Sequence, residues 1–347
     1  MATMKAAFFD GDSSMQLADI PAPEPGPDDV IIRVRATGIC GSDLLMNIDK
    51  TEPDPIPFGH EVAGEIAEVG PGVDARLVGQ RVAIETIGHG LACATCWYCR
   101  QGQFRQCLNK RTNEGGGFAQ YMKRRAMGCY PLPDELSWED GALVEPLAVS
   151  VHGVRRGYMQ GGETVAVLGA GNIGLTAIAA ARALGAGRIF ATARHAQQAE
   201  MAKALGADDV VSSEGTDLKE ALEAATEGRG ADLTIETVGG HTGATLEQSI
   251  DVTRMQGRIV VLDGFRRPIT MDWLQPLLKE QSVIFSSCYS IMNGQHDYEV
   301  AIDMLASGRT SLRQIVTHTY PLENIGEGFA AAYDKTTGSI KVQIHQM

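Results

Sequence analysis

The sequence is short of positive charge. Its 347 residues hold 30 lysines and arginines against 43 aspartates and glutamates, so the formal net charge is −13. A nucleic-acid-binding surface needs a basic face that displaces counterions from phosphates, and this balance argues against one. The acidic total favours solubility and says little about the fold.

Long apolar runs and a leader-like N-terminus are also lacking. The opening MATMKAAFFDGDSS has no basic segment followed by a long apolar stretch. The most apolar later segment, ETVAVLGAGNIGLTAIAAARALGA, is interrupted by glycines and bounded by charges. We therefore expect a cytoplasmic protein without a membrane span. The sequence also shows no internal repeat and no low-complexity segment.

Cysteine is scarce and unevenly spread. The chain has seven cysteines, an odd number, which argues against a disulfide framework and for reduced thiols. Four of them fall in the stretch LACATCWYCRQGQFRQCLN, with the spacing C-x2-C-x2-C-x7-C. One short loop thus offers four thiolates, enough for tetrahedral zinc, at Cys93, Cys96, Cys99 and Cys107.

This four-cysteine loop has two alternatives to zinc. A bacterial iron–sulfur run ends in C-x3-C-P, whereas here seven residues precede Cys107 and Leu108 follows it. A redox cluster of free thiols is the second alternative. Zinc fits best, and a zinc with four protein thiolates has no open position for a substrate, so we expect a structural site here and the chemistry elsewhere.

The length suits two domains, and the texture of the sequence changes near the middle. Residues 4–150 contain short runs such as DVIIRVRATG and VAGEIAEVGPGV, which predict brief strands joined by turns, so this half should be mainly β. From about residue 161, strand-like and helix-like segments alternate, from ETVAVL to GRIVVLDG. This βαβα pattern predicts a parallel, doubly wound sheet. Two helices, near EVAIDMLASG and LENIGEGFAAAYD, and a strand SIKVQIH should close the chain.

A glycine loop follows the first strand of this alternating half. In ETVAVLGAGNIG, Gly169 suits a tight turn, Gly171 lets the backbone approach a pyrophosphate, and Gly174 lets the next helix pack on the strand. The N-terminus of that helix would face the phosphates. We therefore predict a dinucleotide site that includes Asn172 and Ile173; a plain tight turn is the alternative.

Cofactor choice depends on the end of the next strand. NAD enzymes place an acid there, about twenty residues after the loop, to bind the ribose hydroxyls. Here the strand ends in Ala193, Arg194 follows, and no acid is near. A guanidinium in that place can bind a 2′-phosphate through paired, charge-assisted hydrogen bonds. We expect a preference for NADP(H) over NAD(H); the alternative is a solvated Arg194 with the acid supplied elsewhere.

Three further pieces are weak individually: GICGSD with Cys40, FGHE with His60 and Glu61, and LVEPLAV with Glu145. An isolated cysteine is usually a small core residue, and an isolated histidine is usually structural. Beside a dinucleotide fold they gain another interpretation, because a thiolate, an imidazole and a carboxylate can hold zinc with one open position, as catalysis requires.

Over nearly its whole length the chain resembles the zinc-dependent medium-chain dehydrogenases, most of all their sorbitol, polyol and threonine dehydrogenase branch. The resemblance implies a GroES-like, mainly β catalytic domain over residues 1–150, completed by 291–347, and a Rossmann domain over 151–290, with the active site in the cleft. The matching segments are Cys40–Asp43, Gly59–Glu61 with Gly64 and Gly70, the four-cysteine loop, Gly116–Ala119 before Tyr121, Glu145–Ala148 and the glycine loop.

The resemblance implies two zinc ions per chain, one in the four-cysteine loop and one catalytic. Cys40, His60 and Glu61 would bind the catalytic zinc, with Glu145 as a direct or water-exchanged fourth ligand. One thiolate and one carboxylate neutralise Zn²⁺, and a further carboxylate would leave a negative site and a poorer Lewis acid. We therefore expect Glu145 to leave the metal when the substrate arrives.

The resemblance also implies how the substrate proton leaves. Ser42 would take the hydroxyl proton towards solvent, and Asp43 would orient His60. Several family members have a histidine for the proton relay three residues after this serine, but this chain has Leu45. The proton must then leave through water, the cofactor ribose or Glu61.

The predicted function is a zinc-dependent dehydrogenase that uses NADP(H) on a secondary alcohol, of polyol or sugar-alcohol type, and its ketone. Zinc would lower the pKa of the alcohol, as it lowers that of water from about 15.7 to about 7, and the nicotinamide would take the hydride. Alternatives are an NAD-dependent amino-alcohol dehydrogenase of the threonine type, a reductase of hydrophobic aldehydes, and a non-catalytic dinucleotide sensor. The intact zinc ligands and Ser42 argue against the sensor.

Some expectations concern assembly and the remaining residues. Relatives in this branch are usually tetramers and some are dimers, so we expect a homo-oligomer, with GRIVVL and SVIFSS as strands that could pair across a two-fold axis. Segments 45–56 and 265–289 should shape the substrate pocket. We expect His89, His152 and His241 to be structural, because none has a partner at ligand spacing.

Overall fold

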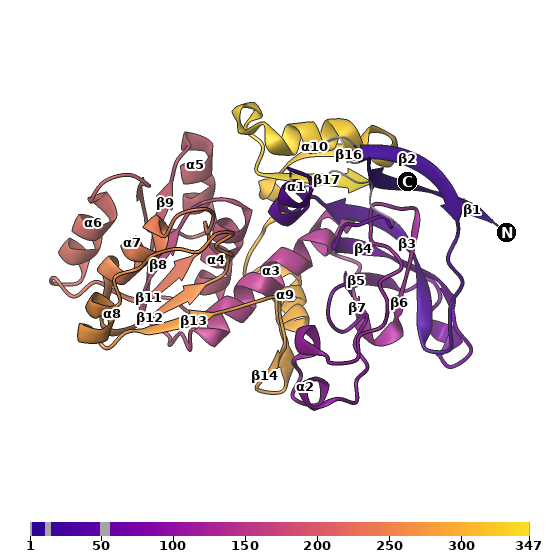
Figure 1. The fold of residues 1–347 in the computed structure, drawn as a ribbon, viewed down its shortest axis with the longest axis horizontal. Coiled ribbons are helices and arrows are strands. Elements are labelled where there is room, and N and C mark those ends of the chain that lie inside the picture. Colours follow the sequence, from indigo (N-terminus) through magenta and orange to yellow (C-terminus); the bar gives the residue numbers. More distant parts are fainter. Residues whose placement is uncertain (1, 11–14, 49–55, 347) are drawn as a thin grey trace. The chain divides into compact units, whose positions relative to one another are not determined.

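The computed structural model describes residues 2–10, 15–48 and 56–346, without the side chains of residues 45–48. The predicted pocket segment 45–56, including the side chain of Leu45, therefore lies largely outside the described residues. The chain forms two compact units: unit 1 comprises residues 1–145, 290–306 and 313–347, and unit 2 comprises residues 146–289 and 307–312 (Figure 1).

Unit 1 is built on a seven-stranded sheet in the order β16-β17-β3-β4-β5-β7, with β6 paired to β3. Only β16 and β17 run parallel to each other; the other pairs are antiparallel. β3 and β4 are rich in valine and isoleucine, whose side chains form the core of this sheet. The bounds are β3 Asp29–Gly38, β4 Glu61–Val69, β5 Arg81–Glu85, β6 Tyr121–Arg125, β7 Cys129–Pro131, β16 Val316–Pro321 and β17 Lys341–His345.

Two small hairpins and four helices complete the mainly β unit. The helix α10 packs against β16 and β17, and the two lie together in Figure 1. The hairpins are β1 Thr3–Phe9 with β2 Met15–Pro21, and β14 Ile291–Met292 with β15 Gln295–His296; the helices are α1 Gly41–Ile48, α2 Trp97–Arg100, α9 Asp297–Ala306 and α10 Ile325–Tyr333.

A long helix, α3 (Trp138–Arg156), carries the chain from unit 1 into unit 2, and it was not predicted from the sequence. A reciprocal cap starts it: Ser137 Oγ accepts from the Asp140 N–H, and the Asp140 carboxylate accepts from the Ser137 N–H. Two arginines at its C-terminal turn favour the helix dipole. Pro146 lies inside the helix, where it removes one backbone hydrogen bond, and this explains why the segment was not predicted as a helix.

Unit 2 is the predicted parallel sheet. Its six strands run in the order β10-β9-β8-β11-β12-β13, and every pair is parallel. By chain order this is 3-2-1-4-5-6, the order of dinucleotide-binding Rossmann folds. The bounds are β8 Thr164–Leu168, β9 Arg188–Ala193, β10 Asp209–Ser212, β11 Ala231–Glu236, β12 Thr253–Val261 and β13 Ser282–Phe285.

The crossover helices also follow the prediction. α4 packs beside α5, and α6 packs beside α7. With right-handed crossovers on both sides of β8, these pairs cover opposite faces of the sheet. The helices are α4 Asn172–Ala183, α5 Ala196–Ala204, α6 Asp217–Ala225, α7 Ala244–Val252 and α8 Leu274–Leu278.

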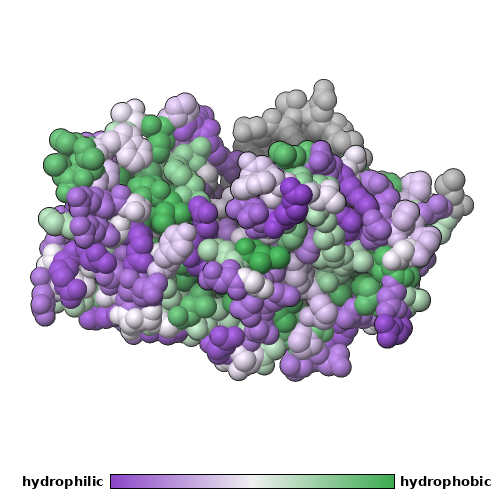
Figure 2. All heavy atoms as spheres, turned by 90° about the horizontal axis from the view of Figure 1, so that it is seen from below, coloured by the Kyte–Doolittle hydropathy of each residue, from purple (hydrophilic) through white to green (hydrophobic). Residues whose placement is uncertain are grey.

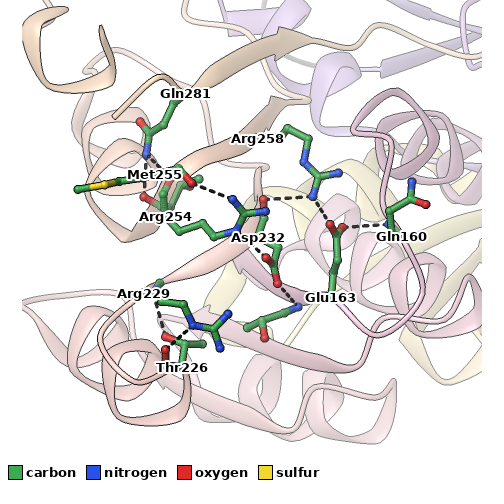
Figure 3. Close-up of polar contacts among 12 residues, drawn as sticks. Gln160, Glu163, Thr226, Arg229, Asp232, Arg254, Met255, Arg258 and Gln281 are labelled. Atoms are coloured by element: carbon green, nitrogen blue, oxygen red, sulfur yellow. Dashed lines mark hydrogen bonds and ion pairs between the residues drawn. The ribbon is translucent and has the colours of Figure 1, made fainter. Parts of the chain in front are cut away.

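The amino ends of the central strands in unit 2 are tied together by ion pairs (Figure 3). Asp232 in β11 accepts from the Thr164 N–H of β8 at 2.8 Å and pairs with Arg254 of β12 at 2.6 Å. Arg258 of β12 pairs with Glu163, just before β8. These contacts lie at the amino ends of the strands. A ligand of a doubly wound sheet binds at the opposite, carboxyl ends of the strands.

None of the described helices is both long and apolar enough to cross a membrane. Figure 2 shows one face of the molecule, on which hydrophilic residues predominate and hydrophobic residues form separate patches. Exposed leucines lie together on α8, where Leu277 is 70% exposed and Leu278 is 71% exposed.

Candidate active site and cysteine lobe

Cys40 lies between the end of β3 and the start of α1. Its backbone N–H donates to the Asp43 carboxylate at 2.9 Å, and its carbonyl accepts from the Asp43 N–H at 3.1 Å. Asp43 is 1% exposed, so this tight turn is fixed from inside the protein. Cys40 is partly buried next to this turn, and Ser42, on α1, is exposed.

His60 immediately precedes β4, and its ring is oriented by the same aspartate. His60 Nδ1 lies 3.4 Å from Asp43 Oδ1, and the His60 carbonyl accepts from Thr86 Oγ1 at 3.1 Å. Burial alone would lower the pKa of His60, but the neighbouring Asp43 and Cys40 outweigh it and raise the pKa well above its usual value. Because Nδ1 faces Asp43, Nε2 is the nitrogen left for a ligand.

Glu61, the first residue of β4, is 0% exposed. Both of its carboxylate oxygens lie 2.7 Å from Lys341 Nζ, which also donates to the Ile39 carbonyl at 3.0 Å. Opposite Glu61 on β3 stands Gly38, where an added Cβ would lie 1.8 Å from Glu61 Oε2. The absence of a side chain at Gly38 therefore makes the room in which the carboxylate lies.

Lys341 is a residue that the sequence reasoning missed. It lies on β17, is 1% exposed, and its burial lowers the pKa of its amine, yet Glu61, Cys40 and Glu145 outweigh that effect and raise it. Lys341 stays protonated and adds one positive charge that the count made from the sequence omitted. With it, Zn²⁺, Cys40 and Glu61 carry one net positive charge, and binding Glu145 would make the site neutral, so charge alone does not disfavour Glu145 as a ligand.

The structure brings three of the predicted zinc ligands together. One ligand atom each from Cys40, His60 and Glu61 lies within 4.8 Å of the other two, and Glu145 is outside that set. Glu145 is nevertheless 5% exposed, lies on α3 next to Pro146 and contributes to the raised pKa of Lys341, so it lies within electrostatic reach. The donor set of thiolate, imidazole and carboxylate fits Zn²⁺ with an open position.

The four cysteines of the predicted structural site also converge around the short helix α2. Their sulfur atoms all lie within 4.8 Å of one another. The Sγ–Sγ distance is 3.9 Å for Cys93 and Cys99 and 3.5 Å for Cys96 and Cys99. Zinc–sulfur bonds of about 2.3 Å in a tetrahedron give edges of about 3.8 Å, so the lobe is arranged for a closed zinc site.

The electrostatics of this cysteine lobe agree with metal binding. Hydrogen bonds from Thr95 and from the Cys96 N–H lower the pKa of Cys93 to about 5, and backbone hydrogen bonds also lower the pKa of Cys96. Burial, with the hydrogen bonds of Cys96 and Cys107, raises the pKa of Cys99 to about 12. All seven cysteines are free thiols, as expected. A divalent cation would compensate the thiolates that the lobe gathers.

The glycine loop in unit 2 has the geometry that a pyrophosphate needs. Gly169 has a φ of +93°, and its N–H donates to Thr192 Oγ1 at 2.9 Å. A Cβ at Gly174 would lie 1.7 Å from the Gly169 carbonyl, whereas a Cβ at Gly171 would meet nothing within 4 Å. Gly171 is the N-cap of α4, so the loop leaves open space in front of a helix N-terminus that begins at Asn172.

Arg194 follows Ala193, the last residue of β9, and its side chain is exposed. It is therefore available to a ligand at the carboxyl edge of the sheet. The neighbouring His195 is exposed too and caps α5 without a side-chain hydrogen bond. A contact with a 2′-phosphate requires an exposed cation at this position, and Arg194 provides one.

One group of potential ligands was not foreseen. His89, expected to be structural, lies with Glu85 and His296, and one ligand atom of each is within 4.8 Å of the others. Glu85 and His89 lie four residues apart, a spacing that could have suggested a pair of metal ligands. The sequence carried no such signal for His296, which lies in a different part of the chain.

Family models match two stretches of the chain: "Alcohol dehydrogenase GroES-like domain" matches residues 26–134, and "Zinc-binding dehydrogenase" matches residues 172–307. Sorbitol dehydrogenase of Bacillus subtilis (strain 168) is 33% identical over 99% of this chain and 97% of its own length. L-threonine 3-dehydrogenase of Pyrococcus horikoshii is 32% identical over 94% of each chain. A zinc-binding dehydrogenase of Sinorhizobium meliloti 1021, solved with bound NADP, superposes with a TM-score of 0.85 at 27% identity and covers 100% of both chains.

Proposed function

Because this chain belongs to the zinc-dependent medium-chain dehydrogenases, in the branch of the polyol and threonine dehydrogenases, we propose that it transfers a hydride between a secondary alcohol of the polyol or sugar-alcohol class, with its ketone, and NADP(H). The observation that carries the proposal is the convergence of Cys40, His60 and Glu61 within 4.8 Å. Their chemistry suits a catalytic rather than a closed metal site, because one position is left for substrate.

The chemistry of the reaction would come from two bound groups, a zinc ion and a nicotinamide cofactor. Zinc, held by Cys40, His60 and Glu61, would act as a Lewis acid on the alcohol oxygen, and the nicotinamide would accept the hydride. A second zinc would sit in the cysteine lobe as a structural ion. Glu145 would be the exchangeable fourth ligand of the catalytic ion, and Lys341 makes its binding electrically neutral.

The protein's own residues orient the site and move the proton. Asp43 holds the His60 ring through Nδ1 and fixes the Cys40 backbone, so one buried carboxylate positions two ligands. Ser42 is exposed at the start of α1 and can accept and pass on a proton at its hydroxyl. Glu61 has both oxygens bound to Lys341, which makes it a poor base, so we assign the proton path to Ser42 and water.

The preference for NADP(H) rests on Arg194. It is an exposed cation directly after β9, where an NAD enzyme has an acid. In the dinucleotide site we include the loop residues Asn172 and Ile173 with the three glycines, and Ala193 beside the arginine. The relative from Sinorhizobium meliloti was solved with NADP, which supports a cofactor with a 2′-phosphate for a chain of this fold.

The test is the absorbance of reduced nicotinamide during turnover of the purified protein. NADP and NAD are compared on polyols, simple secondary alcohols and threonine. We expect turnover that prefers NADP and a polyol. In an Arg194→Ala variant the KM for NADP should rise while the KM for NAD stays unchanged; Arg309→Ala, which removes another exposed arginine, is the matched control.

Other results would redirect the proposal. Turnover with NAD alone would contradict the role of Arg194. Preference for threonine would establish the second candidate, which the identity to L-threonine 3-dehydrogenase supports. Silence with every substrate, at full zinc occupancy, would contradict the proposed substrate class.

A homo-oligomer is part of the same proposal. β13 is the edge strand of the parallel sheet, and Phe285 at its end is 64% exposed. An unpaired edge with an exposed aromatic residue suits pairing with a second copy. Sedimentation of the native protein and of Phe285→Lys, which should dissociate it, tests this assignment.

A further inference from the structure

A third cluster of metal-ligating side chains lies within unit 1, away from both predicted zinc sites. Glu85 ends β5, His89 follows in the loop that leads to the cysteine lobe, and His296 is the last residue of β15. One ligand atom from each lies within 4.8 Å of the others. Neither the family motifs nor the dehydrogenase reaction uses these residues.

The distances in this cluster match those between the ligands of a small divalent cation. Glu85 Oε2 lies 3.1 Å from His296 Nε2 and 3.9 Å from His89 Nδ1. The Tyr130 hydroxyl lies 2.9 Å from His89 Nδ1 and 3.3 Å from Glu85 Oε2. Bonds of about 2.0 to 2.1 Å to zinc in a tetrahedron give edges of about 3.3 Å, and the four distances scatter around that value.

The charge of the cluster also favours a cation. Glu85 is 0% exposed, and in the described part of the chain its only ion-pair partners are the two imidazoles. Burial lowers the pKa of His89 to about 4, so that ring is neutral at neutral pH and keeps a lone pair for a ligand bond. A divalent cation would place positive charge beside this buried carboxylate.

The hydrogen bonds present are compatible with metal binding at a small cost. The Tyr298 N–H donates to His296 Nδ1 at 3.2 Å, which places the ring proton on Nε2 in this state. A metal at Nε2 would displace that proton to Nδ1, and the Tyr298 N–H would have to turn away. The metal would replace this long hydrogen bond and the contacts of Tyr130 with His89 and Glu85, a loss that is small beside the affinity of a three-ligand site for zinc.

We propose that Glu85, His89 and His296 bind a zinc-class divalent cation, with the Tyr130 hydroxyl or a water at the fourth corner. The site would be structural. His89 stacks on Phe104 of the cysteine lobe with ring centroids 3.9 Å apart, and the Ile291 N–H of β14 donates to Gly102 of the lobe at 3.0 Å.

The cation would therefore join β5, the loop after it and the β14–β15 hairpin behind the cysteine lobe; α2 and β14 lie near each other in Figure 1. The His89 side chain is 15% exposed, so an ion has a route in from solvent. The site does not depend on the dehydrogenase activity, and its failure would leave the proposed function standing.

The direct test is anomalous diffraction at the zinc edge from crystals of the full-length protein grown with zinc chloride. The proposal expects a peak between Glu85, His89 and His296 in addition to those at Cys40 and the cysteine lobe. Peaks at the latter two positions alone would overturn it. Absence of the Cys40 peak would instead count against the proposed function.

Metal content gives a second test that needs no crystal. Native protein, dialysed free of loose zinc, should hold three zinc ions per chain by mass spectrometry, and His89→Ala should hold one fewer. His318→Ala, which removes a half-buried histidine of β16 outside the three clusters, is the matched control and should keep the native count. Two ions in the native protein, or an unchanged count in His89→Ala, would overturn the proposal.

Discussion

Two buried glutamates face each other across β4 and β5 and have different partners. Glu61 and Glu85 are paired residues in the antiparallel register, and both are 0% exposed. Glu61 is held by Lys341 at 2.7 Å from both oxygens. Glu85 has two imidazoles and a phenol around it. The first carboxylate has a permanent cation, and the second depends on a proton or a metal for its charge balance.

The difference shows how one sheet carries two kinds of buried acid. A lysine amine stays charged at any physiological pH, so the Glu61 pair holds its geometry whether or not a metal is bound. An imidazole of lowered pKa carries no charge at neutral pH. Glu85 can therefore gain a cation by binding a metal, whereas Glu61 keeps Lys341 beside it with or without the proposed catalytic zinc. The following changes break or sharpen this comparison.

The largest effect should come from Lys341→Met. The substitution leaves Glu61 buried without its cation, and breaking a buried ion pair in this way costs about 3–5 kcal/mol of unfolding free energy. Urea denaturation of the protein freed of its catalytic zinc measures it, because zinc on Glu61 would itself supply a cation. Lys5→Met, which removes an exposed pair with Asp19, is the control and should cost at most about 1 kcal/mol.

The double variant Lys341→Met with Glu61→Gln sharpens the same test. Removing the charge of both partners should restore much of the stability, because no uncompensated charge remains. Equal losses in the single and double variants would show that packing of the lysine stem, and not the charge of Glu61, dominates.

Gly38→Ala should displace the Glu61 carboxylate through a steric clash. A Cβ at this position would overlap Glu61 Oε2, so the carboxylate has to move. We expect zinc affinity at the Cys40 site to fall by about 10–100-fold, as for other changes that misplace a ligand. A chelator competition assay measures it. Gly264→Ala, where an added Cβ meets nothing within 4 Å, should leave the affinity unchanged.

Glu85→Gln should have a smaller effect than Lys341→Met. Glu85 Oε1 accepts from the His89 N–H at 2.6 Å, and an amide can keep only part of the acceptor set around it. We expect a loss of about 1–3 kcal/mol in thermal or urea unfolding. If Glu85→Gln lost more unfolding free energy than Lys341→Met, the expected order of the two effects would be contradicted.

The smallest effect is the change of stability with pH, at most about 1.4 kcal/mol of unfolding free energy per pH unit for one titrating group. Burial lowers the pKa of His89 to about 4, while an unfolded histidine titrates near about 6.5. Between these values the unfolded chain binds a proton that the native ring does not, so stability falls as pH falls from about 6.5 towards about 4. A metal on His89 would add to the same trend. His89→Phe, which can keep the stacking on Phe104, should flatten this part of the stability curve; identical slopes would contradict it.

Much of the fold followed from patterns along the chain. The alternation after residue 161 predicted the parallel sheet, and the glycine loop was found with its turn, its open position and its close approach at Gly169, Gly171 and Gly174. The cysteine spacing and the Cys40, His60 and Glu61 motifs likewise predicted residues that meet in space. The glycine loop and the four cysteines each lie in one short stretch, so sequence spacing is enough to find them. The set of Cys40, His60 and Glu61 extends from residue 40 to residue 61 and followed from the family resemblance.

The rest depends on contacts between distant segments. Lys341 lies 280 residues from Glu61 in the chain, and nothing in SIKVQIH distinguishes it from a surface lysine on an edge strand. His296 is likewise far from Glu85 in the sequence and close to it in the fold. α3 was missed for another reason: Pro146 argues locally against a helix, and tertiary packing with a strong cap overrides it.

The central claim, that the three-ligand site of Cys40, His60 and Glu61 holds the zinc on which turnover depends, is tested most directly by Cys40→Ser. Zinc content and NADP-linked oxidation of a polyol are measured on the same preparations of variant and native protein. The account predicts that the variant loses one zinc ion per chain and its turnover, and keeps the zinc of the cysteine lobe. A variant that keeps its full zinc content, or that turns over at the native rate, would contradict it.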